Sequence, residues 1–201
     1  ASSDNAYPFS FDAATSTVSR GKIEVLARAE KPAPGGWVVN SAGQPLTDSR
    51  EILRCLEDGS AMLLPLGGAG ETTGGHKGYG LATMVEILCA ALCGGAYMKD
   101  LLGKAPDGSR RPYMLGHFFL AIDVAHFLLV DQSAAITGQI MRDLQNARRA
   151  PGQDHVYVAG EKEHERRKLV CECGVPLNRN LRRDLGAVRD GLGIPGYEAY
   201  F

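Results

Sequence analysis

The sequence predicts an α+β fold, or an irregular α/β sandwich, for two reasons. Short strand-like runs and amphipathic helical runs are mixed along the chain without a regular β–α–β rhythm. The 201 residues are also 44% hydrophobic, which is enough for a substantial core in one large or two small domains. No internal repeat or low-complexity segment indicates a solenoid or a disordered chain.

The strand-like runs are short, apolar and bounded by turn residues. We expect strands at residues 7–16, 37–40, 61–66, 117–123 and 155–160. The run at 117–123 has the composition of a strand in the interior of a sheet, because nearly all of its side chains are apolar.

The helical runs follow the 3.6-residue period, and we expect helices at residues 19–28, 49–58, 81–92, 136–144 and 181–192. In the second helix Asp48 is the expected N-cap, Glu51 completes a capping box, and Gly59 ends the helix. Apolar residues of the third helix recur at helical spacing, namely Leu81, Met84, Val85, Leu88 and Leu92.

Charge and hydropathy argue against two kinds of partner. The net charge is −1, so there is no electrostatic argument for binding nucleic acid or an anionic membrane. The longest charged run, Glu161–Lys168, mixes both signs and is typical of a solvated face. The apolar run at 81–93 is interrupted by Glu86 and is too short to span a bilayer.

The five cysteines are odd in number and irregularly spaced, which indicates a reducing compartment such as the cytoplasm. Cys89 and Cys93 lie in an apolar helical run and are expected to be buried thiols. Cys171 and Cys173, with His164 nearby, lack the second cysteine pair of a zinc site, so no metal site is expected.

A glycine-rich stretch, Gly67–Gly80, connects an expected strand to an expected helix. It is not a Walker A loop, because the lysine comes one place late and Gly78 replaces the hydroxyl residue. It is not a Rossmann fingerprint either, since a motif starting at Gly68 would need glycine in place of Thr73. Two interpretations stay open at this point: an anion-binding turn at a helix start, or a flexible loop with an ordinary surface lysine.

The segment Gly74–Ala82 resembles the signature of the malate/L-lactate dehydrogenase family, whose members are non-Rossmann NAD(P)-dependent oxidoreductases. Four further stretches are similar to family motifs and occur in the same order: Phe11–Ser16, Gly35–Asp48, Gly116–Asp123 and Val156–Glu163. The sequence departs from these motifs at Asn40, where aspartate is common, and at Ala159, where proline is common.

The resemblance implies a non-Rossmann cofactor-binding sheet with packed helices, in a domain spanning residues 1–150. Residues 151–201 are then a C-terminal segment that packs on an N-terminal substrate domain. The implied reaction is reversible hydride transfer between NAD or NADP and a small 2-hydroxy or 2-oxo acid such as malate or lactate. The expected partners are that acid, a missing N-terminal segment and a second copy in a homodimer.

The resemblance also assigns roles to individual residues. Asp12 is expected to orient the family's catalytic histidine, although the alternative is that it only caps a turn. None of the five histidines of this sequence lies in the catalytic motif, so the chain resembles the C-terminal part of such an enzyme. The expected cofactor-binding residues are Ser10, Phe11, Asp12, Ala13, Ala14, Thr15, Ser16, His76, Lys77, Gly78, Gly160, Glu161 and Lys162.

Two alternatives remain open within this assignment. Glu161 either accepts hydrogen bonds from a cofactor ribose or only stabilises a structural turn. The chain as a whole is either part of a dehydrogenase, inactive when isolated, or a non-catalytic nucleotide-binding chain derived from the same family.

Overall fold

A computed structural model describes residues 1–200 and divides the chain into two compact units. One unit, here called the helical unit, consists of Ala1–Ala13 and Leu120–Pro176. The other, the sheet unit, consists of Ala14–Phe119 and the residues from Leu177 onward. The boundaries differ from the expected division after residue 150, and the roles expected for those two domains stay predictions.

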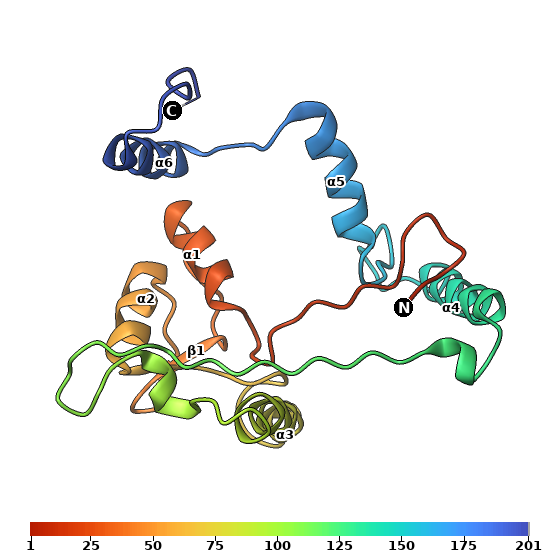
Figure 1. Cartoon of the computed structure of the whole chain (residues 1–201), viewed down its shortest axis with the longest axis horizontal. Helices are drawn as coiled ribbons and strands as arrows, with labels where there is room; N and C mark the ends of the chain where they lie inside the picture. Colours follow the sequence, from red (N-terminus) through yellow and green to blue (C-terminus); the bar gives the residue numbers. More distant parts are fainter. Residues whose placement is uncertain (201) are drawn as a thin grey trace. The chain divides into compact units, whose positions relative to one another are not determined.

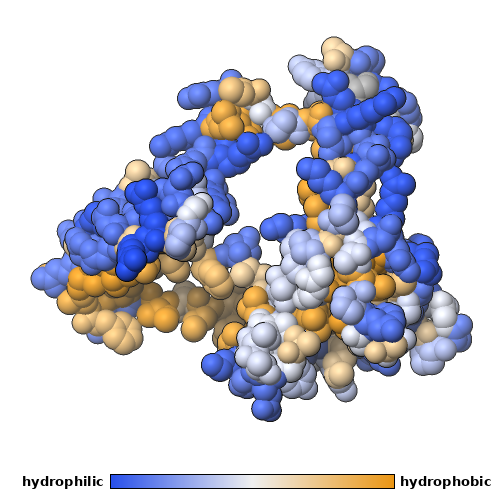
Figure 2. All heavy atoms as spheres, turned by 180° about the vertical axis from the view of Figure 1, so that it is seen from behind, coloured by the Kyte–Doolittle hydropathy of each residue, from blue (hydrophilic) through white to orange (hydrophobic). Residues whose placement is uncertain are grey.

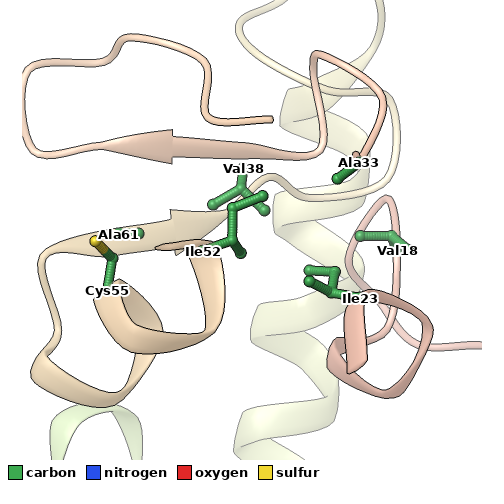
Figure 3. Close-up of a cluster of buried hydrophobic side chains, with 7 residues drawn as sticks. All are labelled: Val18, Ile23, Ala33, Val38, Ile52, Cys55 and Ala61. Atoms are coloured by element: carbon green, nitrogen blue, oxygen red, sulfur yellow. The ribbon is translucent and has the colours of Figure 1, made fainter. Parts of the chain in front are cut away.

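The sheet unit is built on a two-stranded antiparallel sheet and two helices (Figure 1). Strand β1 (Val38–Asn40) pairs with β2 (Ala61–Leu63), with Val39 opposite Met62. Helices α1 (Arg20–Arg28) and α2 (Ser49–Asp58) pack against each other. Small and branched apolar side chains from all four elements and their connections form the core (Figure 3): Val18, Ile23, Ala33, Val38, Ile52, Cys55 and Ala61.

The expected ends of α2 are confirmed. The Asp48 carboxylate accepts a hydrogen bond of 2.8 Å from the backbone N–H of Glu51, which satisfies one of the free amides at the helix start. Gly59 ends the helix in the left-handed conformation, with φ of 78°. Within the described residues Glu51 makes no return bond to Asp48, so the capping box is only half formed.

The third helix, α3 (Gly75–Glu86), begins inside the glycine stretch and continues as a π-helical turn, η1 (Ile87–Ala91). Most of the apolar residues that recur along α3 and η1 lie at the surface, since Leu81, Met84, Val85 and Leu92 are all exposed. Cys93 is also exposed and Cys89 is only partly buried, contrary to the expected buried thiols. Hydrophobic side chains accordingly reach the surface shown in Figure 2.

The remaining elements of the sheet unit are a 3₁₀ turn, η2 (Met98–Leu102), and helix α6 (Arg179–Leu192). Asn178 caps the start of α6 by accepting a hydrogen bond of 2.8 Å from the Leu181 N–H, and Gly193 ends it as expected.

The helical unit contains α4 (Val130–Gln145), α5 (Glu161–Cys173) and a 3₁₀ turn, η3 (Val124–His126). Its N-terminal segment lies along α4, where Asp4 forms an ion pair with Arg142 at 2.9 Å and the Asn5 amide donates to the Gly138 carbonyl. Gly138 is buried under this segment, and a side chain at that position would overlap the Asp4 carboxylate.

Three of the five expected strands are not strands in the structure. Residues 7–16, 117–123 and 155–160 are extended or irregular, apart from an isolated bridge between Ser16 and Pro65. A strand needs a continuous ladder of backbone bonds to a neighbour, and these runs make only isolated ones, such as the bond from the Ser10 N–H to the Ala159 carbonyl. The α+β class is nevertheless confirmed. No helix among the described residues is long and apolar enough to cross a membrane.

We predict that Ile52→Ala will destabilise the sheet unit by about 2–5 kcal/mol, because Ile52 is fully buried and the substitution leaves a cavity. The control is Val25→Ala on α1, whose side chain is 59% exposed and should change stability by less than about 0.5 kcal/mol. Urea unfolding followed by circular dichroism measures both. Equal effects of the two substitutions would contradict the assigned core.

Candidate cofactor-binding site

The glycine stretch folds into a tight turn in which backbone packs directly on backbone. An added Cβ at Gly78 would overlap the Leu66 carbonyl oxygen and lie 2.6 Å from the Leu66 nitrogen. A Cβ at Gly75 would overlap the Gly68 oxygen, and one at Gly67 would lie 2.6 Å from the Gly74 oxygen. These approaches are closer than real side-chain contacts, so only glycine allows this turn.

The turn ends at the start of α3 and leaves the first amides of that helix without a side-chain cap. The N-cap residue is Gly74, in the left-handed conformation with φ of 85°. His76 and Lys77 follow in the first helical turn, and both are exposed. Open amides, the positive end of the helix dipole and a lysine therefore occur together, which is a chemical arrangement suited to an anion. The flexible-loop alternative does not account for the close packing of the turn.

The structure brings the expected residues Ala14–Ser16 next to the entry of this turn. The Leu66 N–H donates to the Thr15 carbonyl at 3.1 Å, and the Thr17 N–H donates to the Leu64 carbonyl at 2.7 Å. The Ser16 hydroxyl donates to the Val18 carbonyl at 2.7 Å. Ser16 thus already uses its proton, whereas the Thr15 hydroxyl makes no hydrogen bond within the described residues and stays available for a ligand.

A second group of expected residues lies in the helical unit, at the start of α5. The Ser10 N–H donates to the Ala159 carbonyl at 3.2 Å, so Ser10–Ala13 leaves directly from the turn at Gly160. Gly160 has φ of 96°, and a Cβ there would lie 2.9 Å from the Pro8 oxygen. Glycine is therefore required at 160 both by its backbone conformation and by the close approach of the N-terminal segment.

Glu161 is the buried charged group of this second group. Its Oε1 atom lies 2.7 Å from Nε2 of His155, and its Oε2 atom accepts a hydrogen bond of 3.0 Å from the Val158 N–H. Burial acts to raise the pKa of Glu161, but the bonds from Val158, Gln145 and His155 outweigh it and hold the pKa below its ordinary value. Because its oxygens are already bonded inside the chain, these contacts favour the structural alternative for Glu161 over ribose binding.

Of the other side chains near Glu161, some contact an aromatic ring and others are exposed to solvent. The Lys162 ammonium lies over the Tyr157 ring, 4.4 Å from the ring centre, and His155 meets the same ring edge-on at 4.5 Å between ring centres. Phe11 is 74% exposed. Asp12 is exposed too, and within the described residues it makes no hydrogen bond or ion pair.

The expected site residues therefore fall into two groups. Ser10–Ala13 and Gly160–Lys162 belong to the helical unit, and Ala14–Ser16 and His76–Gly78 belong to the sheet unit. Three residues around Glu161 were not among the expected site residues, namely Tyr7, Gln145 and His155. Only His155 had a local signal, since it lies six residues before Glu161 at the start of an expected strand.

Comparison with known proteins identifies the family. Residues 1–186 match the malate/L-lactate dehydrogenase family, and the chain belongs to that family. It is 35% identical over 189 residues to a malate dehydrogenase of Pyrococcus horikoshii, which covers 94% of this chain and 50% of the relative. It is 31% identical to an L-sulfolactate dehydrogenase of Methanocaldococcus jannaschii, again covering 94% of this chain and 50% of the relative.

A third relative acts on a different kind of compound. It is a Δ1-pyrroline-2-carboxylate/Δ1-piperideine-2-carboxylate reductase of Pseudomonas aeruginosa, 34% identical, covering 90% of this chain and 48% of the relative. The crystal structure of malate dehydrogenase from Entamoeba histolytica is similar with a TM-score of 0.88 and 33% identity, covering 96% of this chain and 53% of that one. This chain thus spans about half the length of the relatives it matches.

We predict opposite effects for two alanine substitutions on α3. Gly78→Ala should destabilise the sheet unit by about 1–3 kcal/mol, because the new methyl group overlaps the Leu66 backbone. Gly80→Ala, two residues later with no atom within 4 Å of the new Cβ, should stabilise by about 0.4–1 kcal/mol. Thermal and urea unfolding compare the two. Similar effects of both substitutions would disprove the close packing at Leu66.

We also predict a pH-dependent contribution of Glu161 to stability. Its pKa in the folded state lies below the unfolded value of about 4.3, so its contribution is complete above that pH and is lost as the pH falls through the folded pKa. The stability difference between the wild type and Glu161→Gln should therefore be largest at neutral pH and shrink below about pH 4. Urea unfolding from pH 3 to 7 measures this difference, with the exposed neighbour Glu163→Gln as control. A difference that does not vary with pH would be the contrary result.

Proposed function

We propose that this chain forms part of an NAD(P)-dependent oxidoreductase that transfers a hydride between the nicotinamide and C2 of a small 2-oxo or 2-hydroxy acid. Family membership carries this proposal, because the matched relatives include malate and sulfolactate dehydrogenases and a pyrroline- and piperideine-carboxylate reductase. The compounds in these names share a carboxylate next to an oxidisable or reducible carbon. A 2-carboxylate with C=O or C=N at C2 is thus the substrate class that we infer, with malate or lactate as examples of the reduced acid.

The sheet unit supplies the cofactor end of the proposed site. Lys77 and the open amides of α3 bind the cofactor's phosphates, and His76 lies beside them. Thr15 offers a free hydroxyl next to the same turn, and the small side chain of Ala14 permits close approach of the cofactor. The one sheet of the described residues is antiparallel, which supports a non-Rossmann arrangement, since a Rossmann sheet is mostly parallel.

Asp12 supports the chemical step in this proposal. Hydride addition to a carbonyl leaves an alkoxide that needs a proton donor within hydrogen-bond reach. We assign that role to a histidine outside these 201 residues, oriented by Asp12 through its other ring nitrogen. The exposure of Asp12 and its lack of a partner among residues 1–200 support this role over that of a turn cap.

The exposed surface supports further contacts with protein. The solvent-accessible area of the chain is 14901 Å². Two separate compact domains with the lengths of the helical unit and the sheet unit would together expose only about 11,000 Å². Phe119 and Phe127, 86% and 80% exposed, are examples of the uncovered apolar residues. We propose that the N-terminal half present in the relatives and a second copy of the chain, in a homodimer, cover this surface. All five cysteines are free, which supports a reducing compartment, the cytoplasm.

The second candidate is a non-catalytic nucleotide-binding chain. The turn at Lys77 favours this candidate too, because the amides of the turn and the lysine need no proton donor to bind the phosphates of a dinucleotide. Turnover in the presence of the missing half separates the two candidates.

We predict that Lys77→Ala weakens cofactor binding by about 1.5–3 kcal/mol, because one charge-assisted phosphate contact is lost. The Kd should therefore rise about ten- to a hundredfold. Titration of NADH and NADPH fluorescence measures it. The control is Lys99→Ala. Lys99 is an exposed lysine in the 3₁₀ turn η2, so this substitution removes the same charge as Lys77→Ala but at another place. Equal affinities of the two variants would remove Lys77 from the site.

We predict that the 201 residues alone do not turn over malate or lactate at a useful rate, since absence of a general acid costs ~10²–10⁴-fold. Adding the N-terminal half of a family member, in cis or as a separate polypeptide, should restore NADH consumption with oxaloacetate or pyruvate. Sedimentation of the restored protein should show a dimer. Rapid turnover by the isolated chain would place a proton donor within it, and failure to restore turnover despite cofactor binding would favour the non-catalytic candidate.

A further inference from the structure

A polar cluster around Glu161 connects three separate parts of the helical unit. These are the N-terminal segment, the end of α4 and the turn before α5. Gln145 at the end of α4 donates a hydrogen bond of 2.8 Å to the Tyr7 hydroxyl, and the same amide lowers the pKa of Glu161. His155 and the Val158 N–H bond to the two carboxylate oxygens of Glu161. A buried carboxylate is retained at low cost only when its oxygens are bonded in this way.

Tyr7 is the member of the cluster that fixes the N-terminal segment. Its ring stacks on His164 of α5 with 5.0 Å between ring centres. Burial, followed by the nearby Glu161 charge, raises the pKa of its hydroxyl. The chain then runs from Tyr7 past Pro8, whose carbonyl lies against Gly160, to Ser10, whose N–H is bonded to Ala159. Tyr7 and Ser10 thus hold the segment at both ends of a four-residue span.

We infer that Tyr7, Gln145 and His155 are positioning residues, which act through Glu161 to hold Ser10–Ala13, and with it Asp12, at a fixed place beside the Gly160 turn. This inference rests on the proposed function for the meaning of Ser10–Ala13, but the contacts themselves lie wholly within the helical unit. In this inference the carboxylate of Glu161 accepts the hydrogen bonds that connect the other residues of the cluster. Asp12, which has no partner of its own among the described residues, depends on the cluster for its position.

The test follows the mobility of the segment without requiring any ligand. Amide hydrogen exchange, measured by mass spectrometry on the full chain, compares wild type with His155→Leu, His155→Gln, Tyr7→Phe and the control Glu163→Gln. His155→Leu should speed exchange of the Ser10 amide, which is bonded to Ala159 and is followed in the peptide covering residues 8–13, at least tenfold, while exchange in α1 and α2 of the sheet unit stays unchanged. His155→Gln keeps a side-chain N–H donor and should restore most of the protection. Tyr7→Phe, which keeps the ring but removes the hydroxyl, should give an intermediate increase.

A second arm relates the same variants to the ligand. If the wild type binds NADH or NADPH, His155→Leu should raise its Kd at least fivefold, and His155→Gln and Glu163→Gln should not. Unchanged exchange in residues 8–13 of His155→Leu would overturn the inference, and so would faster exchange that His155→Gln fails to reverse. Faster exchange with an unchanged Kd would leave the cluster a structural feature and overturn its role in positioning the site. Absence of binding by the wild type would count against the proposed function, while the exchange result would still decide whether the cluster holds the segment.

Discussion

The backbone contact between Gly78 and Leu66 is the constraint on which the cofactor end of the site depends. Gly78 of α3 lies so close to Leu66 that no side chain fits between them. The Leu66 N–H is bonded in turn to the Thr15 carbonyl. One residue therefore joins the start of α3, the turn that precedes it and the segment that contains Thr15. If this contact opened, the helix amides and Lys77 would lose their fixed place relative to Thr15.

The helical unit uses the same physical device at Gly160, where the N-terminal segment approaches a turn more closely than a side chain would permit. There the contact is reinforced by a buried carboxylate, whereas the turn at Gly78 is held by main-chain packing and by the Thr17 hydroxyl, which donates to the Pro65 carbonyl at 2.7 Å. In both units a glycine near the beginning of a helix lets a second segment lie against the backbone. At Gly160 that segment contains Ser10, and at Gly78 it contains Leu66, which is bonded in turn to Thr15. Ala13 and Ala14 are consecutive, so the two groups are joined covalently although they belong to different units.

The expectations that failed share one physical cause. Residues 117–123 have the composition of an interior strand, and Cys93 lies in an apolar helical run, yet Phe119 and Cys93 are exposed. Composition records whether a segment suits burial, but burial itself requires another segment to cover it. The relatives are about twice as long as this chain, so the covering segments that we propose are consistent with what these residues lack.

The sequence by itself determined the features that depend on contacts within a few residues. The Asp48 cap, the Gly59 and Gly193 helix ends, and the motif containing Lys77 were all readable because a cap or a turn involves neighbours along the chain. Only the tertiary structure decided that Gly78 packs on Leu66 and that Glu161 is buried against His155. It also decided that Tyr7 belongs to the same cluster as Gln145, 138 residues away. The contact between Tyr7 and Gln145 depends on how distant segments pack, and no local pattern of residue types specifies that.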